Sequence, residues 1–294
     1  MKIVVTHMSP DWDAISSVWL IKKYLAGWQD ADVQFVPAGT RAGGDIHETI
    51  ERLGDNEVIH VDTGLGPLDH HQIQDTSVSA VSRTWDYVQE QLKQNGDTLT
   101  PIHVEAVSRI VAVIVALDHF KEVFWENPAS DHYEFSLYGV LEGLKFVRQE
   151  HDKDYVTFGI QCLDALVAQF ENRIWAEKEI AEKGIKFETS YGPGMGFETL
   201  NDTVLKLAQK MGYVVVVRKD PRKGYVRIKA LPEDGKKKGV DLTLAYEQLR
   251  KIDPDATWFL HISKKMLLNG TPKNPKIKPS TLNVRDIIKV LERI

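Results

Sequence analysis

The chain has one cysteine among its 294 residues and no apolar run long enough to cross a membrane. A single cysteine, Cys162, excludes an internal disulfide bond and suits a reducing compartment. Because a spanning helix needs about 20 consecutive apolar residues, no membrane partner is expected. The sequence begins with a β-branched run at 2–6 instead of a targeting segment, so we expect a cytoplasmic protein.

Positive charge is scarce in the first two thirds of the chain and abundant in the last third. Residues 1–190 carry a net charge of −15, whereas residues 191–294 hold 21 Lys and Arg against 11 Asp and Glu, a net charge of +10. A basic lobe beside an acidic one can supply the phosphate contacts of a polyanionic substrate. Opposite charges also favour docking between lobes and solubility, and composition alone does not separate these interpretations.

Short β runs alternate with helical patterns over residues 1–120. The expected strands are 2–6, 33–38 and 57–62, and the expected helices are 14–25, 47–53, 81–92 and 103–117. This order predicts a parallel sheet flanked by helices. A long helical region follows at 136–186, and the glycines at 192–196 mark a break. We therefore predict an α/β domain at 1–160, joined by a helix at 161–190 to a smaller, basic α+β domain at 191–294.

Carboxylates and imidazoles collect directly after two of the expected strands. The residues concerned are His7, Asp11, Asp13, Asp62, Asp69, His70 and His71. Ligands of open α/β sheets bind at the carboxyl ends of strands. Carboxylates and imidazoles without thiolates favour divalent cations of intermediate hardness, Mn²⁺ above all. The two segments therefore predict a metal site.

Each residue also has a structural interpretation. Asp13 can cap the helix expected to start at residue 14, and adjacent histidines are usually a surface feature. The joint order and the strand-end positions favour the metal site. His60 is interpreted as a buried core histidine or as support for a ligand, because it shares a strand face with Asp62. Trp12 can stack on a base or sugar, although filling the space between sheet and helix is the simpler role.

The ordered motifs resemble the DHH phosphoesterase superfamily. They are His-x-x-x-Asp-x-Asp at 7–13, an Asp ending a later strand at 62, and Asp-His-His at 69–71. The superfamily includes RecJ-type exonucleases, nanoRNases, cyclic-dinucleotide phosphodiesterases and family II inorganic pyrophosphatases. It implies a metal-dependent phosphoesterase domain at the N-terminal end of the chain.

The resemblance also implies a fourth aspartate at the end of another buried element. Asp118 follows the apolar run at 110–117 and is assigned to this role. Asp131, Asp152 and Asp154 are the alternatives, and all three lie in polar stretches.

The resemblance implies two divalent cations, with Mg²⁺ or Co²⁺ as alternatives to Mn²⁺. The implied ligands of the first ion are His7, Asp11 and Asp62, and those of the second are Asp13, Asp62, His70 and Asp118. Asp62 would then bridge the two ions. Asp69 would orient an imidazole, as carboxylates commonly do for histidines at metal sites. His71 would face the scissile phosphate as a binder or proton donor, which makes Asp62 and His71 the implied catalytic residues.

The C-terminal third reads as β-rich, with strands expected at 213–218, 225–230 and 257–262. Its run from 231 to 271 loosely resembles the Myg-type exonuclease branch of the superfamily, although the Ser-Pro-Asp-Trp-Asp motif at 9–13 departs from that branch. In DHH proteins this part offers a loop to the substrate. The implied substrate-binding residues are Arg218, His261, Lys264, Asn269 and Gly270. A buried core role for His261 and a solvated role for Lys264 stay open, and the lysines at 236–238 are interpreted as a solvated loop.

These observations favour a Mn²⁺-dependent phosphodiesterase or exonuclease. It would act on short single-stranded nucleic acid or a nucleotide by two-metal activation of water. A small-phosphate hydrolase, such as a pyrophosphatase or phosphomonoesterase, is the first alternative, although the basic substrate motif of family II pyrophosphatases is not evident. An inactive, metal-stabilised nucleic-acid-binding module is the second. The expected partner is a phosphate-containing substrate, and a homodimer is left open.

Overall fold

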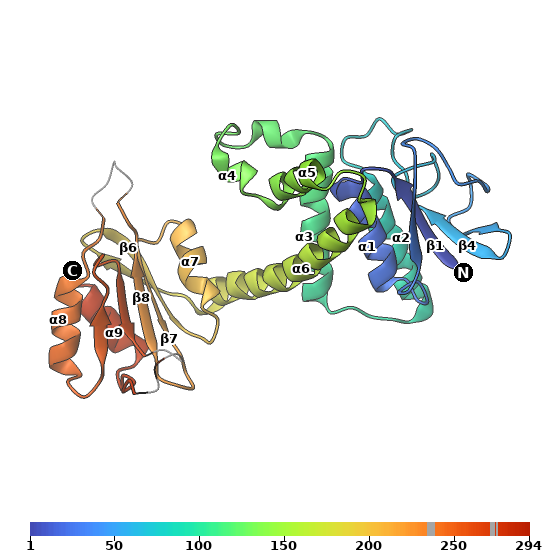
Figure 1. Cartoon of the computed structure of the whole chain (residues 1–294). Coiled ribbons are helices and arrows are strands. Elements are labelled where there is room, and N and C mark those ends of the chain that lie inside the picture. Colours follow the sequence, from blue (N-terminus) through green and yellow to red (C-terminus); the bar gives the residue numbers. More distant parts are fainter. Residues whose placement is uncertain (234–238, 271–273, 275) are drawn as a thin grey trace. The chain divides into compact units, whose positions relative to one another are not determined.

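The computed structural model describes residues 1–233, 239–270, 274 and 276–294. The chain forms two compact units, Met1–Glu171 and Asn172–Ile294, which divide inside the 32-residue helix α6 (Asp152–Lys183; Figure 1). The lysine run at 236–238 and Thr271 of the predicted substrate loop lie outside the described residues. Across the described ranges, no helix combines the length and apolar character needed to cross a membrane.

A four-stranded sheet forms the centre of the first unit, in the order β2-β1-β4-β3. The strands are β1 (Lys2–His7), β2 (Asp32–Val36), β3 (Glu51–Leu53) and β4 (Asn56–His60). β1 pairs in parallel with both β2 and β4, whereas β3 is an antiparallel edge strand. Because β1 and β4 run parallel, their carboxyl ends meet at one edge of the sheet.

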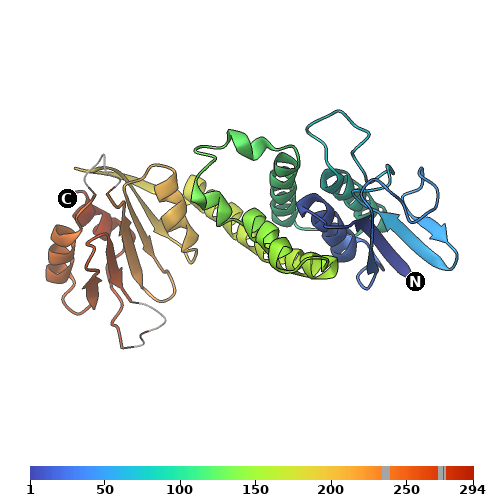
Figure 2. The same ribbon diagram turned by 45° about the horizontal axis from the view of Figure 1, so that its top comes forward.

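The helices α1 (Trp12–Tyr24), α2 (Ala80–Asn95) and α3 (Pro101–Asp118) lie on one face of this sheet (Figure 2). Val4 and Ile59 join the core on the helical face, whereas Ile3, Val5 and Val58 form a separate small cluster. Successive strand residues point to opposite faces, which separates the two clusters. The predicted α/β fold of a sheet flanked by helices is confirmed.

The helix predicted at 47–53 is wrong. The chain instead forms β3, whose Leu53 pairs with Asn56 across a two-residue turn. Gly54 in this turn has φ +59°, a conformation that favours glycine. The buried Glu51 also fixes the strand, because its carboxylate contacts both Arg41 and His60.

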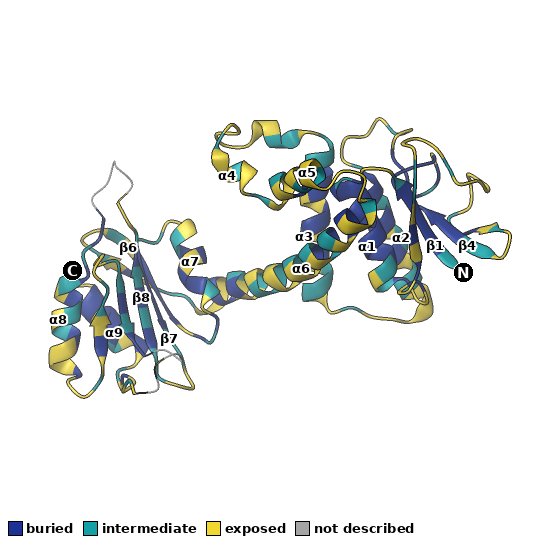
Figure 3. Ribbon diagram, in the orientation of Figure 1, coloured by how far each residue is buried: buried dark blue, intermediate teal, exposed yellow. Residues whose placement is uncertain are grey.

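The predicted continuous helical region at 136–186 is two helices, α5 (Leu137–Val147) and α6. The chain turns between them at Glu150, whose φ of +62° is incompatible with a right-handed helix. The short helices η1 (Lys121–Phe124) and α4 (Asp131–Glu134) precede α5. Figure 3 shows the strands β1, β4, β7 and β8 as mostly buried, whereas α5 is largely exposed or intermediate.

The second unit contains a six-stranded sheet in the order β5-β6-β7-β8-β10-β9. The strands are β5 (Ile185–Thr189), β6 (Gly192–Glu198), β7 (Val215–Lys219), β8 (Val226–Ala230), β9 (Trp258–Leu260) and β10 (Met266–Asn269). The helices are α7 (Thr203–Lys210), α8 (Thr243–Ile252) and α9 (Val284–Leu291). Val216 packs with α7 and the end of α6, whereas Val215 and Val217 pack with α8 and α9. Helices therefore cover both faces of this α+β unit.

The break predicted at the glycines 192–196 is wrong, because these residues form most of β6. A Cβ atom on Gly194 would lie 2.3 Å from the ring of Phe187, and one on Gly196 would lie 2.6 Å from Ile288 Cδ1. The glycines therefore allow close packing of side chains over the strand, and they do not interrupt it.

Candidate metal centre

His7 at the end of β1 and Asp11 in the loop that follows lie at the carboxyl edge of the first sheet. Asp11 is the N-cap of α1, and its Oδ1 accepts hydrogen bonds from the backbone N–H groups of Asp13 (2.9 Å) and Ala14 (3.1 Å). The capping role considered for Asp13 thus belongs to Asp11. His7 Nε2 lies 3.3 Å from Asp62 Oδ2, across the gap between the two strand ends.

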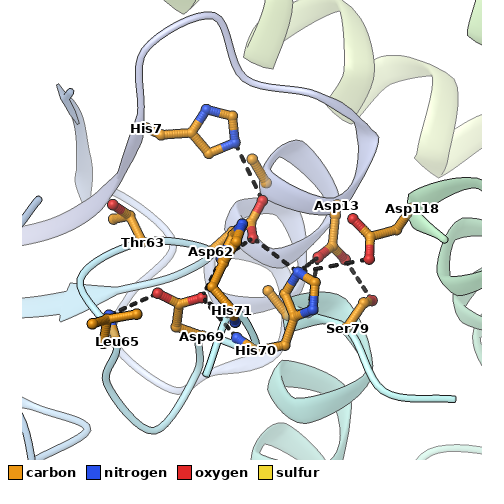
Figure 4. A network of polar contacts seen from close by, with 12 residues as sticks. His7, Asp13, Asp62, Thr63, Leu65, Asp69, His70, His71, Ser79 and Asp118 are labelled. Atoms are coloured by element: carbon orange, nitrogen blue, oxygen red, sulfur yellow. Dashed lines mark hydrogen bonds and ion pairs between the residues drawn. The ribbon is translucent and has the colours of Figure 1, made fainter. Parts of the chain in front are cut away.

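Asp13 is buried and bound to the start of α2. Its Oδ1 accepts hydrogen bonds from Ser79 Oγ and Val81 N, and its Oδ2 accepts one from Ala80 N, each over 2.8 Å (Figure 4). Burial and the charge of Asp118 raise the pKa of Asp13 to about 6, although these hydrogen bonds oppose the rise. The helix terminus therefore fixes the orientation of a carboxylate whose charge is destabilised by its neighbours.

Asp62 follows β4 in a left-handed backbone conformation, with φ +53°. Such conformations are uncommon for residues other than glycine and cluster at functional sites. The side chain is 3% exposed, and burial raises its pKa well above the ordinary value, against the opposing hydrogen bond to His7. Burial alone would lower the pKa of His7, but Asp62 and Asp11 outweigh it and raise this pKa to about 9. Protonated His7 therefore places a positive charge beside Asp62 and Asp11. A metal ion bound at this place would neutralise the same two carboxylates.

His70 lies among three carboxylates (Figure 4). Its Nε2 is 3.6 Å from one oxygen each of Asp13, Asp62 and Asp118. These separations are too long for hydrogen bonds. In the described part of the chain, His70 Nε2, Asp62 Oδ1 and Asp118 Oδ2 are buried atoms without a hydrogen-bond partner. A divalent cation between them would satisfy all three, so the residues present fit a metal ion.

Ligand-capable atoms form three overlapping groups in the described residues. The groups are His7, Asp11 and Asp62; Asp62, His70 and His71; and His70, Asp118 and His119. The first group equals the ligand set predicted for one ion. Asp62 and His70 link the groups, and the contact of Asp13 with His70 connects it to the same cluster. The structure therefore brings all six predicted ligands together, from the end of β1, the start of α1, the loop that follows β4 and the end of α3.

His119 was not predicted to be part of the site. It follows Asp118 at the end of α3, and its Nε2 donates a hydrogen bond to the carbonyl oxygen of Val78 over 2.8 Å. Its position directly after Asp118 was the available signal, because both leave the same helix end. None of the alternatives Asp131, Asp152 and Asp154 belongs to these groups in the described residues. Asp152 accepts a hydrogen bond from Ser9 N in the loop between β1 and α1, and Asp154 pairs with Arg148.

Asp69 holds the imidazole of His71. Its Oδ1 accepts a hydrogen bond from His71 Nδ1 over 2.6 Å, while its Oδ2 accepts one from Leu65 N over 2.7 Å. Burial opposes ionisation of Asp69, but the bonds from His71 and the backbone outweigh it and lower the pKa of Asp69. The His71 side chain is 57% exposed. Because its Nδ1 is occupied, His71 presents Nε2 as its remaining ring nitrogen.

Two predicted substrate residues make internal contacts of the second unit. Arg218 is 6% exposed and forms ion pairs with Asp202 and Asp220, at 3.2 and 3.8 Å. Asn269 is fully buried, and its side chain bonds Thr257 O, Lys278 O and Ser280 N. Both side chains are buried and are held by these contacts within the second unit.

The other three substrate residues differ in exposure. Gly270 is buried with φ +87°, and an added Cβ would lie 2.0 Å from the ring of Tyr225. Its role is therefore steric. Lys264 is exposed and pairs with Asp241, while the partly exposed His261 lies 2.8 Å from Ser263 Oγ through Nδ1. His261 and Lys264 remain accessible to a ligand, and His261 is not a core residue.

His60 is a buried histidine with both ring nitrogens bonded. Its Nδ1 lies 2.9 Å from Glu51 Oε1, and its Nε2 accepts a hydrogen bond from Ala42 N over 3.1 Å. The core interpretation of His60 is confirmed.

The contact between Asp69 and His71 gives a testable effect. Replacing Asp69 with Asn weakens the bond that orients His71, so we expect kcat for the predicted phosphoester hydrolysis to fall about 10–100-fold, with no change in the amount of Mn²⁺ that the protein takes up. Kinetics and elemental analysis of metal content measure the two quantities. Gln74→Ala, at an exposed position further along the same loop, is the control and should retain full activity. Loss of metal from Asp69→Asn would show that Asp69 supports a ligand instead.

No protein-family model and no curated protein matches this sequence. Several solved structures are similar to it, with low TM-scores. An uncharacterized protein from Helicobacter pylori G27 is 11% identical, covers 99% of this chain and 98% of its own, and has a TM-score of 0.25. RecJ in complex with Mn²⁺ from Thermus thermophilus is 11% identical over 99% of this chain and 51% of its own, with a TM-score of 0.28. A pGpG-specific phosphodiesterase from Vibrio cholerae is 14% identical over 92% and 93% of the two chains, with a TM-score of 0.32.

Proposed function

We propose that this protein is a metal-dependent phosphodiesterase that hydrolyses a short single-stranded nucleic acid or a nucleotide. The observation that carries the proposal is the position of His70 Nε2, 3.6 Å from oxygens of three carboxylates, with no hydrogen-bond partner in the described chain. The order of the motifs, which resembles the DHH phosphoesterases, supports the same function. Mn²⁺ suits a donor set of carboxylates and imidazoles.

The residues divide into two ligand sets joined by Asp62. His7, Asp11 and Asp62 would hold one ion, and Asp13, Asp62, His70 and Asp118 would hold the other. Two divalent cations held by these residues would lower the pKa of a water molecule and neutralise phosphoryl oxygens. Ser79 and the amides at the start of α2 keep Asp13 in position for this role.

His71 supplies the proton-transfer group in this proposal. Asp69 holds Nδ1 and fixes the ring, so Nε2 is the atom that can contact the phosphate or protonate the leaving oxygen. The side chain is exposed, which lets a substrate reach it. In the second unit, His261 and Lys264 are the predicted residues still available to contact a polyanion.

The activity can be tested directly with the full-length protein. Loaded with Mn²⁺, it should hydrolyse short oligonucleotides, dinucleotides or cyclic dinucleotides, and treatment with a chelator should remove the activity. Elemental analysis in parallel reports the bound metal. Absence of hydrolysis with metal bound would contradict the proposal. Release of phosphate from pyrophosphate, with no cleavage of nucleotides, would identify a small-phosphate hydrolase instead.

A further inference from the structure

We propose that an apolar pocket in the first unit binds a nucleobase of the substrate whose phosphate lies at the candidate metal centre. The inference rests on the proposed function and adds the group by which a nucleotide would be recognised. The pocket has a volume of about 320 Å³, within the usual size of a small-molecule site. Its walls come from α1, α3, α6 and the segment that includes η1, α4 and the start of α5.

The pocket adjoins the predicted ligands at two points of the chain. Trp12 lines it and stands between Asp11 and Asp13 in the sequence. Leu117 lines it and directly precedes Asp118. Because α1 begins and α3 ends at the candidate metal centre, a group in the pocket can be covalently attached to a phosphate at that centre.

The lining suits a flat aromatic ring. Its aromatic members are Trp12, Trp125, Tyr133, Tyr138 and Phe170. Aliphatic side chains, such as Ile114 and Leu163, complete the walls. Stacking on aromatic side chains is a general mode of base binding that tolerates different bases. A pyrophosphate or a phosphomonoester without a ring would leave this surface unused.

Two side chains that line the pocket, Trp12 and Glu122, also carry hydrogen-bonding atoms. Among the described residues, Trp12 Nε1 and Glu122 Oε2 are buried atoms without a hydrogen-bond partner, and Trp12 is 6% exposed. The first is a donor and the second an acceptor. A nucleobase carries both acceptors and donors on its edges, whereas an alkyl chain carries neither. The carboxylate of Glu122 also disfavours an anionic group in the pocket.

The test compares a dinucleotide with two analogues, each carrying a tetrahydrofuran residue in place of one base. With the Mn²⁺-loaded protein, we expect one analogue to have a KM at least about tenfold higher, because stacking is lost. Val113→Phe fills the pocket from a partly exposed position and should raise the KM of the dinucleotide by a similar factor, but not that of this analogue. Val123→Phe is the matched control, because Val123 is exposed and does not line the pocket. Glu122→Gln should change the preference among dinucleotides of different bases.

The outcomes separate the pocket from the proposed activity. Equal KM values for dinucleotide and analogues, with no effect of Val113→Phe, would refute base binding in the pocket. They would not contradict the proposed phosphodiesterase activity. If no dinucleotide is hydrolysed with metal bound, the proposed activity is refuted. Calorimetry that compares the binding of nucleoside 5′-monophosphates with that of ribose 5-phosphate then tests base binding in the pocket alone. Base-dependent binding that Val113→Phe weakens supports it, and equal binding of both ligands, or none, refutes it. Trp125→Leu replaces Val113→Phe if that variant fails to fold.

Discussion

Replacing Asp62 with Asn is expected to reduce phosphodiester hydrolysis at least about 1,000-fold, a larger loss than His71→Ala, for which we expect about 100-fold. Asp62 belongs to both predicted ligand sets, so its loss weakens the binding of both ions, whereas His71 contributes one proton-transfer group. The two variants should also differ in metal content. Asp62→Asn should lose bound Mn²⁺, and His71→Ala should retain it.

Steady-state kinetics and elemental analysis measure these two quantities on the same preparations. Asp86→Asn is the matched control, because Asp86 is an exposed carboxylate on α2 in the same unit. It should keep both activity and metal. Equal residual activity in Asp62→Asn and His71→Ala would contradict the bridging role of Asp62.

The second large effect concerns stability. In chelator-treated protein, Asp62→Asn should be more stable than the wild type at neutral pH, by about 2 kcal/mol, or about 4–8 °C in Tm. The physical reason is that burial, together with the charges of Asp13 and Asp11, disfavours ionised Asp62 more than its hydrogen bond to His7 favours it, so its charge opposes folding when no metal ion is bound. With added Mn²⁺, the wild type should become more stable than Asp62→Asn, because we expect the wild type to bind the ion and the variant not to bind it.

The pH dependence of the metal-free protein follows from the same carboxylates. The pKa of Asp13 rises from 3.8 to about 6, and that of Asp62 also rises, so the folded protein retains protons that the unfolded chain releases. The free energy of unfolding therefore falls as the pH rises through this range. Asp62→Asn should make this slope shallower. Thermal unfolding followed by circular dichroism from pH 4 to pH 8 measures it, and a wild-type slope of opposite sign would contradict the charge-cluster explanation.

Local sequence patterns predicted the elements that carry the candidate site. The β-branched run of β1, the apolar run of α3 and the order of the polar motifs depend on neighbouring residues, and these features agree with the structure. Asp118 could be assigned because a long apolar helix ends there. The same local logic failed at 47–53, where pairing with β4 decides between helix and strand. It failed again at 192–196, where close packing against Phe187 and Ile288 requires glycines inside a strand.

The sequence by itself determined which donor atoms this protein has and that they follow the ends of strands and helices, because periodicity and chemical type are local properties. Only the tertiary structure decided which of these atoms lie close together. The meeting of Asp13 with the start of α2, the three carboxylates around His70 and the burial of Arg218 arise from contacts between residues far apart in the chain. The pocket beside Trp12 was likewise decided by packing, since its walls come from four separate stretches.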